Sequence, residues 1–174
     1  MVDKRELEQG LITSLVQWDN KTTSELELLY PGFVSLNNFT LVLLHLLSDP
    51  QTEIGASWLI KHHLDNHQRI SAAEIELFFE KYHDLTCWQS RLHWLQSLSY
   101  FKVPAKFKTP VEYLLRYAIS DDNTFVRAWA YNGLVHLAKS YPELKEEVVA
   151  LCELAMEDEA ASIKARIRNA IKDL

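Results

Sequence analysis

The sequence predicts an all-α protein built from repeated helical hairpins, and three observations lead to this fold class. The 174 residues include only four glycines, which are too scattered to form a phosphate-binding loop. Apolar residues recur at spacings of three and four, and no run alternates apolar and polar positions as a strand does. A motif also recurs at a shift of 36 to 37 residues, and a fixed period of this length is typical of stacked helical units.

Residues 1–30 are predicted to form an N-terminal helical cap, because they match no repeat and carry one apolar helix face. That face consists of Leu7, Leu11, Leu15 and Trp18. Residues 33–174 carry the predicted repeats, and their most apolar stretch is Phe39 to Leu47. This stretch is far shorter than the roughly 20 residues that span a bilayer, so it predicts a buried helix and no membrane anchor.

Turn-forming residues divide the chain into helical segments of roughly 10 to 17 residues. The expected breaks lie at Asp19-Asn20, Tyr30-Pro31-Gly32, Ser48-Asp49-Pro50, Asn66-His67, Val103-Pro104, Thr109-Pro110, Asp121-Asp122-Asn123, Tyr141-Pro142 and Asp158-Glu159. Pro110 and Pro142 suit the first turn of a helix, where the missing N–H costs nothing. A chain of this length is expected to form one domain, 1–174.

The repeat is clearest in the C-terminal third, where residues 118–137 match residues 155–174 at a constant shift of 37. The aligned pairs are Asp121 and Asp158, Val126 and Ile163, Arg127 and Lys164, Asn132 and Asn169, and Leu137 and Leu174. Residues 46–56 match the same pattern two periods earlier. One more repeat then lies around His83 to Leu98, in a register that leaves Trp88, Gln89 or Ser90 opposite Val126.

This pattern resembles the HEAT repeat, a helical hairpin whose first helix ends in a turn containing Asp and whose second helix carries Val-Arg. The resemblance is closest over residues 121–130 and implies an α-solenoid of about four HEAT-like hairpins plus the cap. It also implies a ladder between neighbouring repeats, with structural roles for Asp121, Arg127, Asp158 and Lys164. The ladder is expected to be incomplete towards the N-terminus, because Gly55 occupies the Arg position and no basic residue is clear around Gln89.

Composition excludes several function classes. Lys and Arg total 18 against 24 Asp and Glu, and the net charge of −6 argues against a main role in gripping nucleic acid. Cys87 and Cys152 each lack a neighbouring cysteine, which excludes CxxC motifs and favours a reduced, cytoplasmic setting. The charged N-terminus lacks the apolar core of a secretory signal. We expect no cofactor.

Histidines are the main candidates for a chemical site. His62, His63 and His67 fall together, and the spacing of His63 and His67 would place them on one helix face, as in a metal pair. The glutamate that a zinc protease needs between them is absent, so a structural or exposed cluster is the simpler interpretation and a pH-sensitive contact is the alternative. Cys87 has His83 one turn away but no third group. We therefore assign no catalytic and no metal-binding residue.

Charge is distributed unevenly near the C-terminus. Seven acidic residues and one lysine lie between Glu143 and Glu159, and four basic residues follow them. The solvated faces of two helices explain this pattern, and the alternative is a charged end that docks a partner or another copy. The best basic patch elsewhere, comprising Lys102, Lys106, Lys108 and Arg116, is predicted to be a solvated loop beside Glu112.

The favoured function is a non-enzymatic adaptor that binds a protein or peptide on the concave surface of the solenoid, because such surfaces are long, stiff and easily varied. The partner-binding residues expected there are Tyr131, Asn132, Val135, Arg168, Asn169 and Lys172. Two alternatives stay open. One is a nucleic-acid-binding protein or an enzyme of the HEAT-like DNA glycosylase type, and the other is a self-assembling structural protein such as a homodimer.

Overall fold

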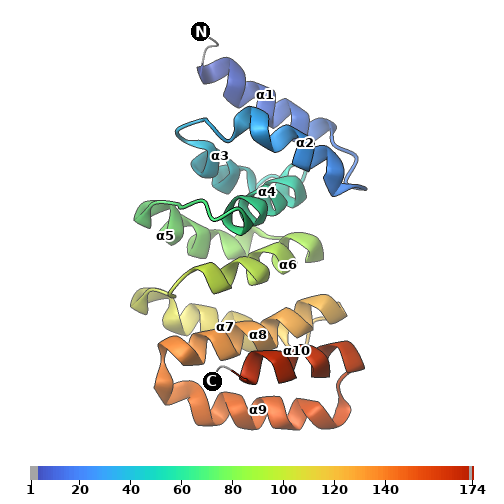
Figure 1. The fold of residues 1–174 in the computed structure, drawn as a ribbon, viewed down its shortest axis with the longest axis vertical. Coiled ribbons are helices and arrows are strands. Elements are labelled where there is room, and N and C mark those ends of the chain that lie inside the picture. Colours follow the sequence, from blue (N-terminus) through green and yellow to red (C-terminus); the bar gives the residue numbers. More distant parts are fainter. Residues whose placement is uncertain (1–3, 173) are drawn as a thin grey trace. The chain divides into compact units, whose positions relative to one another are not determined.

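The computed structural model describes residues 4–172 and 174, and over these residues the chain is all-α, as predicted (Figure 1). The α-helices are α1 (Lys4–Gln17), α2 (Thr23–Phe33), α3 (Phe39–Leu46), α4 (Glu53–Asp65), α5 (Ala72–Glu80), α6 (Trp88–Ser97), α7 (Lys108–Ala118), α8 (Thr124–Ser140), α9 (Lys145–Asp158) and α10 (Ala161–Ile171). Short 3₁₀ turns are η1 (Lys81–Asp84), η2 (Leu98–Tyr100), η3 (Ala105–Phe107) and η4 (Pro142–Leu144).

The chain divides into two compact units, Met1–Trp94 and Leu95–Leu174. Each unit buries its own apolar side chains, so each is described separately below. The expectation of a single domain over 1–174 stays a prediction.

In the first unit, the predicted apolar face of the N-terminal segment lies against the helices that follow it. Leu11, Leu15 and Trp18 are buried, and α1 packs on α2 and α3. Gly55 of α4 allows this approach, because a Cβ atom there would lie 2.8 Å from Leu15 Cδ2. The absence of a side chain at the expected Arg position is therefore a packing requirement of α1.

Two predicted breaks are wrong. The break at Thr109-Pro110 lies inside the first turn of α7, which begins at Lys108. The break at Tyr30-Pro31-Gly32 does not occur, because α2 continues through Pro31 to Phe33. Proline removes the hydrogen bond to the carbonyl four residues back, but here it lies in the last turn, and the amide of Val34 still donates to Tyr30 O at 3.0 Å. The helix therefore ends one turn later than the sequence indicated.

In the later part of the first unit, an aromatic cluster holds α5 and α6 together. Trp94 is 2% exposed, and its ring stacks on Phe78 with 5.2 Å between ring centroids. Its indole N–H donates to the carbonyl oxygen of Phe78 at 2.9 Å. Phe79 and Tyr82 contact the same indole edge to face. Helix α5 itself begins with a Ser71 capping box, so its start is locally encoded.

The second unit is organised around α8, which packs against α7, α9 and α10 (Figure 1). Val126, Ala130, Leu134 and Leu137 are fully buried along this helix. Gly133 lies where α7 comes closest, since a Cβ atom there would lie 2.5 Å from Leu115 Cδ2. Helix α8 is therefore enclosed on most of its circumference.

Arg127 links two turns of the second unit. Its Nη1 donates to the carbonyl oxygens of Asp121 and Asp122 at 2.9 and 3.2 Å, and its Nε forms an ion pair with Glu159 Oε1 at 3.3 Å. Arg127 therefore joins the turn before α8 to Glu159, directly after α9. Asp158, for which the resemblance implied a structural role, is the residue before Glu159, and the ladder itself stays a prediction.

The register around Trp88 follows from the helix starts. Helix α6 begins 36 residues before α8, which places Ser90 opposite Val126, and both residues are fully buried. Arg91 then lies opposite Arg127 and makes a matching contact, because its Nη1 donates to Thr86 O at 3.1 Å. Arg91 of α6 therefore corresponds to Arg127 of α8 in position and in contact, while the repeat itself stays a prediction.

Lys164 binds the last turn of the preceding helix, α9. Its Nζ donates to Glu157 O at 3.0 Å. The first unit carries a polar link of another kind, formed by Glu53 at the start of α4. Glu53 is 1% exposed, and its carboxylate accepts hydrogen bonds from the amides of Thr86 and Cys87 at 2.7 and 2.8 Å.

Glu53 thus caps the start of α6 from another helix. The hydroxyl of Thr86 donates to its Oε2 at 2.6 Å, and the hydroxyl of Ser90 donates to its Oε1. Four donors therefore surround one buried carboxylate, and two of them are backbone N–H groups that the helix leaves without intrahelical partners. The residue holds the turn before α6 against α4.

Candidate functional site

Apart from its ends and Arg127, helix α8 reaches solvent along one stripe. Its members recur at spacings of three and four, and the stripe, termed here the α8 stripe, comprises Phe125, Trp129, Asn132, His136 and Lys139. Helix α10 packs beside it and is exposed over more of its surface. The two helices together form the candidate site.

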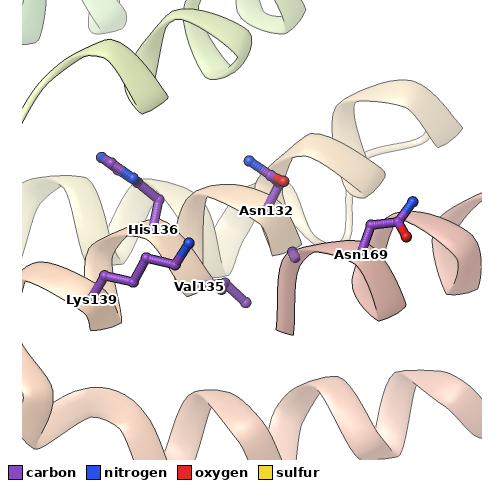
Figure 2. A pocket seen from close by; sticks show the side chains of 6 residues that line it. Asn132, Val135, His136, Lys139 and Asn169 are labelled. Atoms are coloured by element: carbon purple, nitrogen blue, oxygen red, sulfur yellow. The ribbon is translucent and has the colours of Figure 1, made fainter. Parts of the chain in front are cut away.

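A pocket of about 140 Å³ lies between these two helices. It is lined by Asn132, Val135, His136, Lys139, Asn169 and Ala170. Figure 2 shows Asn132, His136 and Lys139 leaving α8 on the same side, with Asn169 on the neighbouring α10. A typical small-molecule site has roughly 300 to 1,000 Å³, so this pocket has room for about one amino-acid side chain.

The structure separates the six partner-binding residues expected from the sequence. Asn132, Val135 and Asn169 line the pocket together, but Val135 is only 1% exposed and lies at its floor. Arg168 and Lys172 are exposed beside it, and Lys172 Nζ donates to Asn169 Oδ1 at 3.3 Å.

Tyr131 differs from the expectation. It is only 6% exposed, because it lies on the side of α8 that is enclosed by neighbouring helices. The exposed face inferred from Val126 was therefore displaced by about one residue, so that it included Tyr131 beside Asn132. Tyr131 belongs to the core of the second unit.

Sequence reasoning missed His136, Lys139 and Ala170. His136 Nε2–H donates to the carbonyl oxygen of Phe101 at 2.7 Å, which fixes the ring at the edge of the pocket. The signal that could have found His136 and Lys139 was their spacing of four and seven residues from Asn132, which places them on one helix face.

Trp129 and Arg166 form a second feature of the same surface. The Arg166 guanidinium carbon lies 4.0 Å from the centroid of the Trp129 ring. Stacking of this kind is worth about 0.5 to 1 kcal/mol at exposed sites, and it holds the cation in one place. Trp129 lies one turn before Asn132, and Arg166 one turn before Asn169. The stacked pair is therefore next to the pocket along both helices.

The charges of this surface have one sign. Helices α8 and α10 contain no Asp or Glu, and their basic residues are Arg127, Lys139, Lys164, Arg166 and Arg168. Helix α9 is the opposite, with five acidic residues and one lysine over Lys145–Asp158. The predicted charge asymmetry thus separates an acidic helix from a basic helix pair.

The basic patch expected around Lys108 and Arg116 is paired with acidic side chains. Lys108 forms an ion pair with Glu143 at 2.5 Å, and Arg116 forms ion pairs with Glu112 at 2.8 Å and Glu147 at 3.0 Å. These contacts neutralise two of the four cations and part of the acidic segment. Arg127 of α8 is likewise paired, with Glu159. The α8 and α10 surface is the stronger candidate for an electrostatic site in the second unit because neither helix carries an acidic residue.

The histidine cluster of the first unit makes aromatic contacts. His62 stacks on Trp58 with centroids 4.7 Å apart, and His63 Nδ1 lies 2.9 Å from the Tyr30 hydroxyl. His63 and His67 do not share a helix face, because α4 ends at Asp65 and His67 has a φ of 59°. Over the described residues, no three His, Cys, Asp or Glu side chains gather as metal ligands.

His93 is the histidine with the largest change in acidity. Burial, with a further contribution from the positive charge of Lys61, lowers the pKa of His93 from 6.5 to about 4. Its Nδ1 lies 2.9 Å from Ser57 Oγ, which is itself buried. The imidazole is therefore neutral at pH 7 and joins α6 to α4.

A pH dependence follows from His93. Between pH 6.5 and 4 the unfolded chain binds a proton that the folded chain does not, so stability falls as the pH decreases through this window. The ring is partly exposed, and we expect the loss to be about 1 to 2 kcal/mol. Urea unfolding of the wild type and of His93→Asn at pH 7 and pH 4.5 measures it. The variant should lose less stability over this interval, and equal losses would contradict the assignment.

The cysteines are both free, and Cys152 is buried. Burial raises the pKa of the Cys152 thiol to about 11, so it stays protonated at neutral pH. A protonated thiol is a weak nucleophile. Cys152 therefore has a packing role in α9.

No family model, no curated protein and no solved structure matches this chain. Within the part of the chain that the structure describes, no helix combines the length and the apolar character needed to cross a membrane.

Proposed function

We propose that this protein is a non-enzymatic interaction module that binds a peptide segment of another protein between α8 and α10. We further propose that the chain is an α-solenoid of about four HEAT-like hairpins with an N-terminal cap, and that these two helices belong to its concave surface. The recurring turn contacts of Arg91, Arg127 and Lys164 support the repeat interpretation. The two free cysteines suit the reduced cytosol as its setting.

One observation carries the proposal, namely the side-chain-sized pocket that is lined by Asn132 of α8 and by Asn169 of α10. An asparagine amide offers two donors and an acceptor, so a pair of them can bind the N–H and C=O groups of an extended chain. Val135 and Ala170 supply the apolar part of the pocket for one side chain of that chain. Such a site recognises a peptide by its backbone and anchors it by one residue.

The test is a selection of peptides from a random library displayed on phage, with the full chain immobilised. We expect the selected peptides to bind the wild type. Their affinity for Asn132→Ala/Asn169→Ala should be lower by a factor of about ten or more, because two hydrogen-bonding amides are removed. Asn37→Ala is the control, since Asn37 is exposed and lies far away in sequence, before α3.

Binding is measured by fluorescence anisotropy with the selected peptides. The proposal is wrong if no peptide is enriched, or if the double variant binds the enriched peptides as well as the wild type does. Circular dichroism of each variant confirms that its helix content is unchanged. The binding measurement and the helix content together separate loss of the site from loss of the fold.

A further inference from the structure

We infer that the bound segment is acidic, and that a glutamate side chain of the partner occupies the pocket between α8 and α10. This inference rests on the proposed function and adds the chemistry of the partner. It starts from charge, because both helices that form the site are free of acidic residues although the whole chain has a net charge of −6. Complementary charge across an interface favours association and excludes partners of the same sign.

The lining of the pocket fits glutamate in particular. Ala170 can contact the methylene groups of the side chain, and the Asn132 and Asn169 amides and the Lys139 ammonium group are the polar groups that line the pocket for its carboxylate. Figure 2 shows the amino group of Lys139 on the same side of α8 as the amide of Asn132. A charged hydrogen bond to a carboxylate contributes more than a neutral one, so glutamate should bind more tightly than glutamine of the same shape.

Arg166 supplies a second position for a carboxylate. Its guanidinium is held on the Trp129 ring, so little side-chain freedom is lost when an anion binds. Along α8, Trp129 and His136 are seven residues apart, which corresponds to about 10 Å of helix. A peptide in the polyproline II conformation covers that length in about three residues, and because this is one full turn, residues three positions apart lie on the same face. The site therefore favours two acidic residues separated by three positions.

A nucleic acid is the other polyanion that such a surface attracts. Binding its backbone strongly needs many cations along a continuous track, and the neighbouring α9 is acidic. The basic residues of α7 are also engaged, since Arg116 pairs with Glu112 and Glu147. The observations therefore favour a short acidic peptide.

The experiment compares three fluorescein-labelled probes on the full chain. The first is a peptide of about twelve residues with glutamates three positions apart. The second is the same peptide with glutamine at every glutamate, and the third is an oligothymidylate of about twelve nucleotides. Anisotropy titrations are run at two salt concentrations, since ion pairs at a surface weaken as salt rises.

We expect the glutamate peptide to bind at least tenfold more tightly than the glutamine peptide. Lys139→Gln/Arg166→Gln should weaken binding of the glutamate peptide at least tenfold and leave the glutamine peptide unchanged. The matched control is Lys4→Gln/Arg69→Gln, which removes one exposed lysine and one exposed arginine from the first unit. It should change binding less than twofold.

Four results would overturn the inference. Equal binding of the two peptides would show that charge is not recognised. In that case the proposed function survives if Asn132→Ala/Asn169→Ala abolishes binding of both peptides. Equal weakening by the control variant would show that only net charge matters. Tighter binding of the oligothymidylate would identify a nucleic-acid surface. If neither peptide binds and the library yields no ligand, the inference and the proposed function both fall.

Discussion

Replacing Glu53 with alanine should lower the free energy of unfolding of the first unit by about 3 to 4 kcal/mol. The carboxylate accepts hydrogen bonds from the amides of Thr86 and Cys87 and from the hydroxyls of Thr86 and Ser90. Its removal leaves these donors without their acceptor at a buried position, and each unsatisfied group costs about 1 to 3 kcal/mol before water or local movement compensates. Glu53→Gln should cost about half as much, because the amide oxygen still accepts while the NH₂ group faces donors.

Urea unfolding followed by circular dichroism measures the loss, with Glu25→Ala as the matched control. Glu25 also lies in the first turn of a helix in the first unit, but it is exposed, so its replacement should cost less than about 0.5 kcal/mol. Hydrogen exchange adds a local readout, because the amides of Thr86 and Cys87 should exchange faster in Glu53→Ala. Unchanged exchange at these two amides would contradict the capping role.

Replacing Trp94 with alanine should cost about 3 to 5 kcal/mol, the range for a large aromatic side chain removed from a core. The indole is 2% exposed and contacts the rings of Phe78, Phe79 and Tyr82. The substitution also leaves the carbonyl of Phe78 without the indole N–H as a donor. Helix α5 should then detach from α6 at a lower urea concentration than in the wild type.

Trp88 offers a control in the same helix. It is the first residue of α6 and is 38% exposed, so Trp88→Ala removes the same side chain from a partly solvent-exposed position. We expect it to cost about 1 kcal/mol or less. The two variants are compared by chemical denaturation under identical conditions. Equal losses would mean that burial of Trp94 among the three rings does not control the stability of this region.

The candidate site was partly accessible from the sequence. The repeat at a shift of 37 residues identified Asn132 and Asn169 as equivalent positions, and both line the pocket. The same reasoning placed Tyr131 on the surface, although its side chain is buried. An apolar helix face can be recognised from spacing, but α8 has neighbours on several sides, and only the packing shows which narrow stripe remains exposed.

The sequence by itself determined the helical class and most of the breaks between helices, because turns, caps and apolar spacing are local properties. Asn123, for example, caps α8 through its own side chain, and the Asp121 carboxylate accepts from the amide of Asn123. The turn at Asn66-His67 is local as well, since His67 adopts a positive φ directly after α4.

Only the tertiary structure decided how distant turns are joined. Glu53 caps α6 across more than thirty residues, Arg127 reaches Glu159, and Arg166 stacks on Trp129. None of these pairs has a local signature, because the sequence around a carboxylate or guanidinium is the same whether that group contacts water or another helix. Their roles depend on the distance between chain segments, which packing of the apolar faces sets.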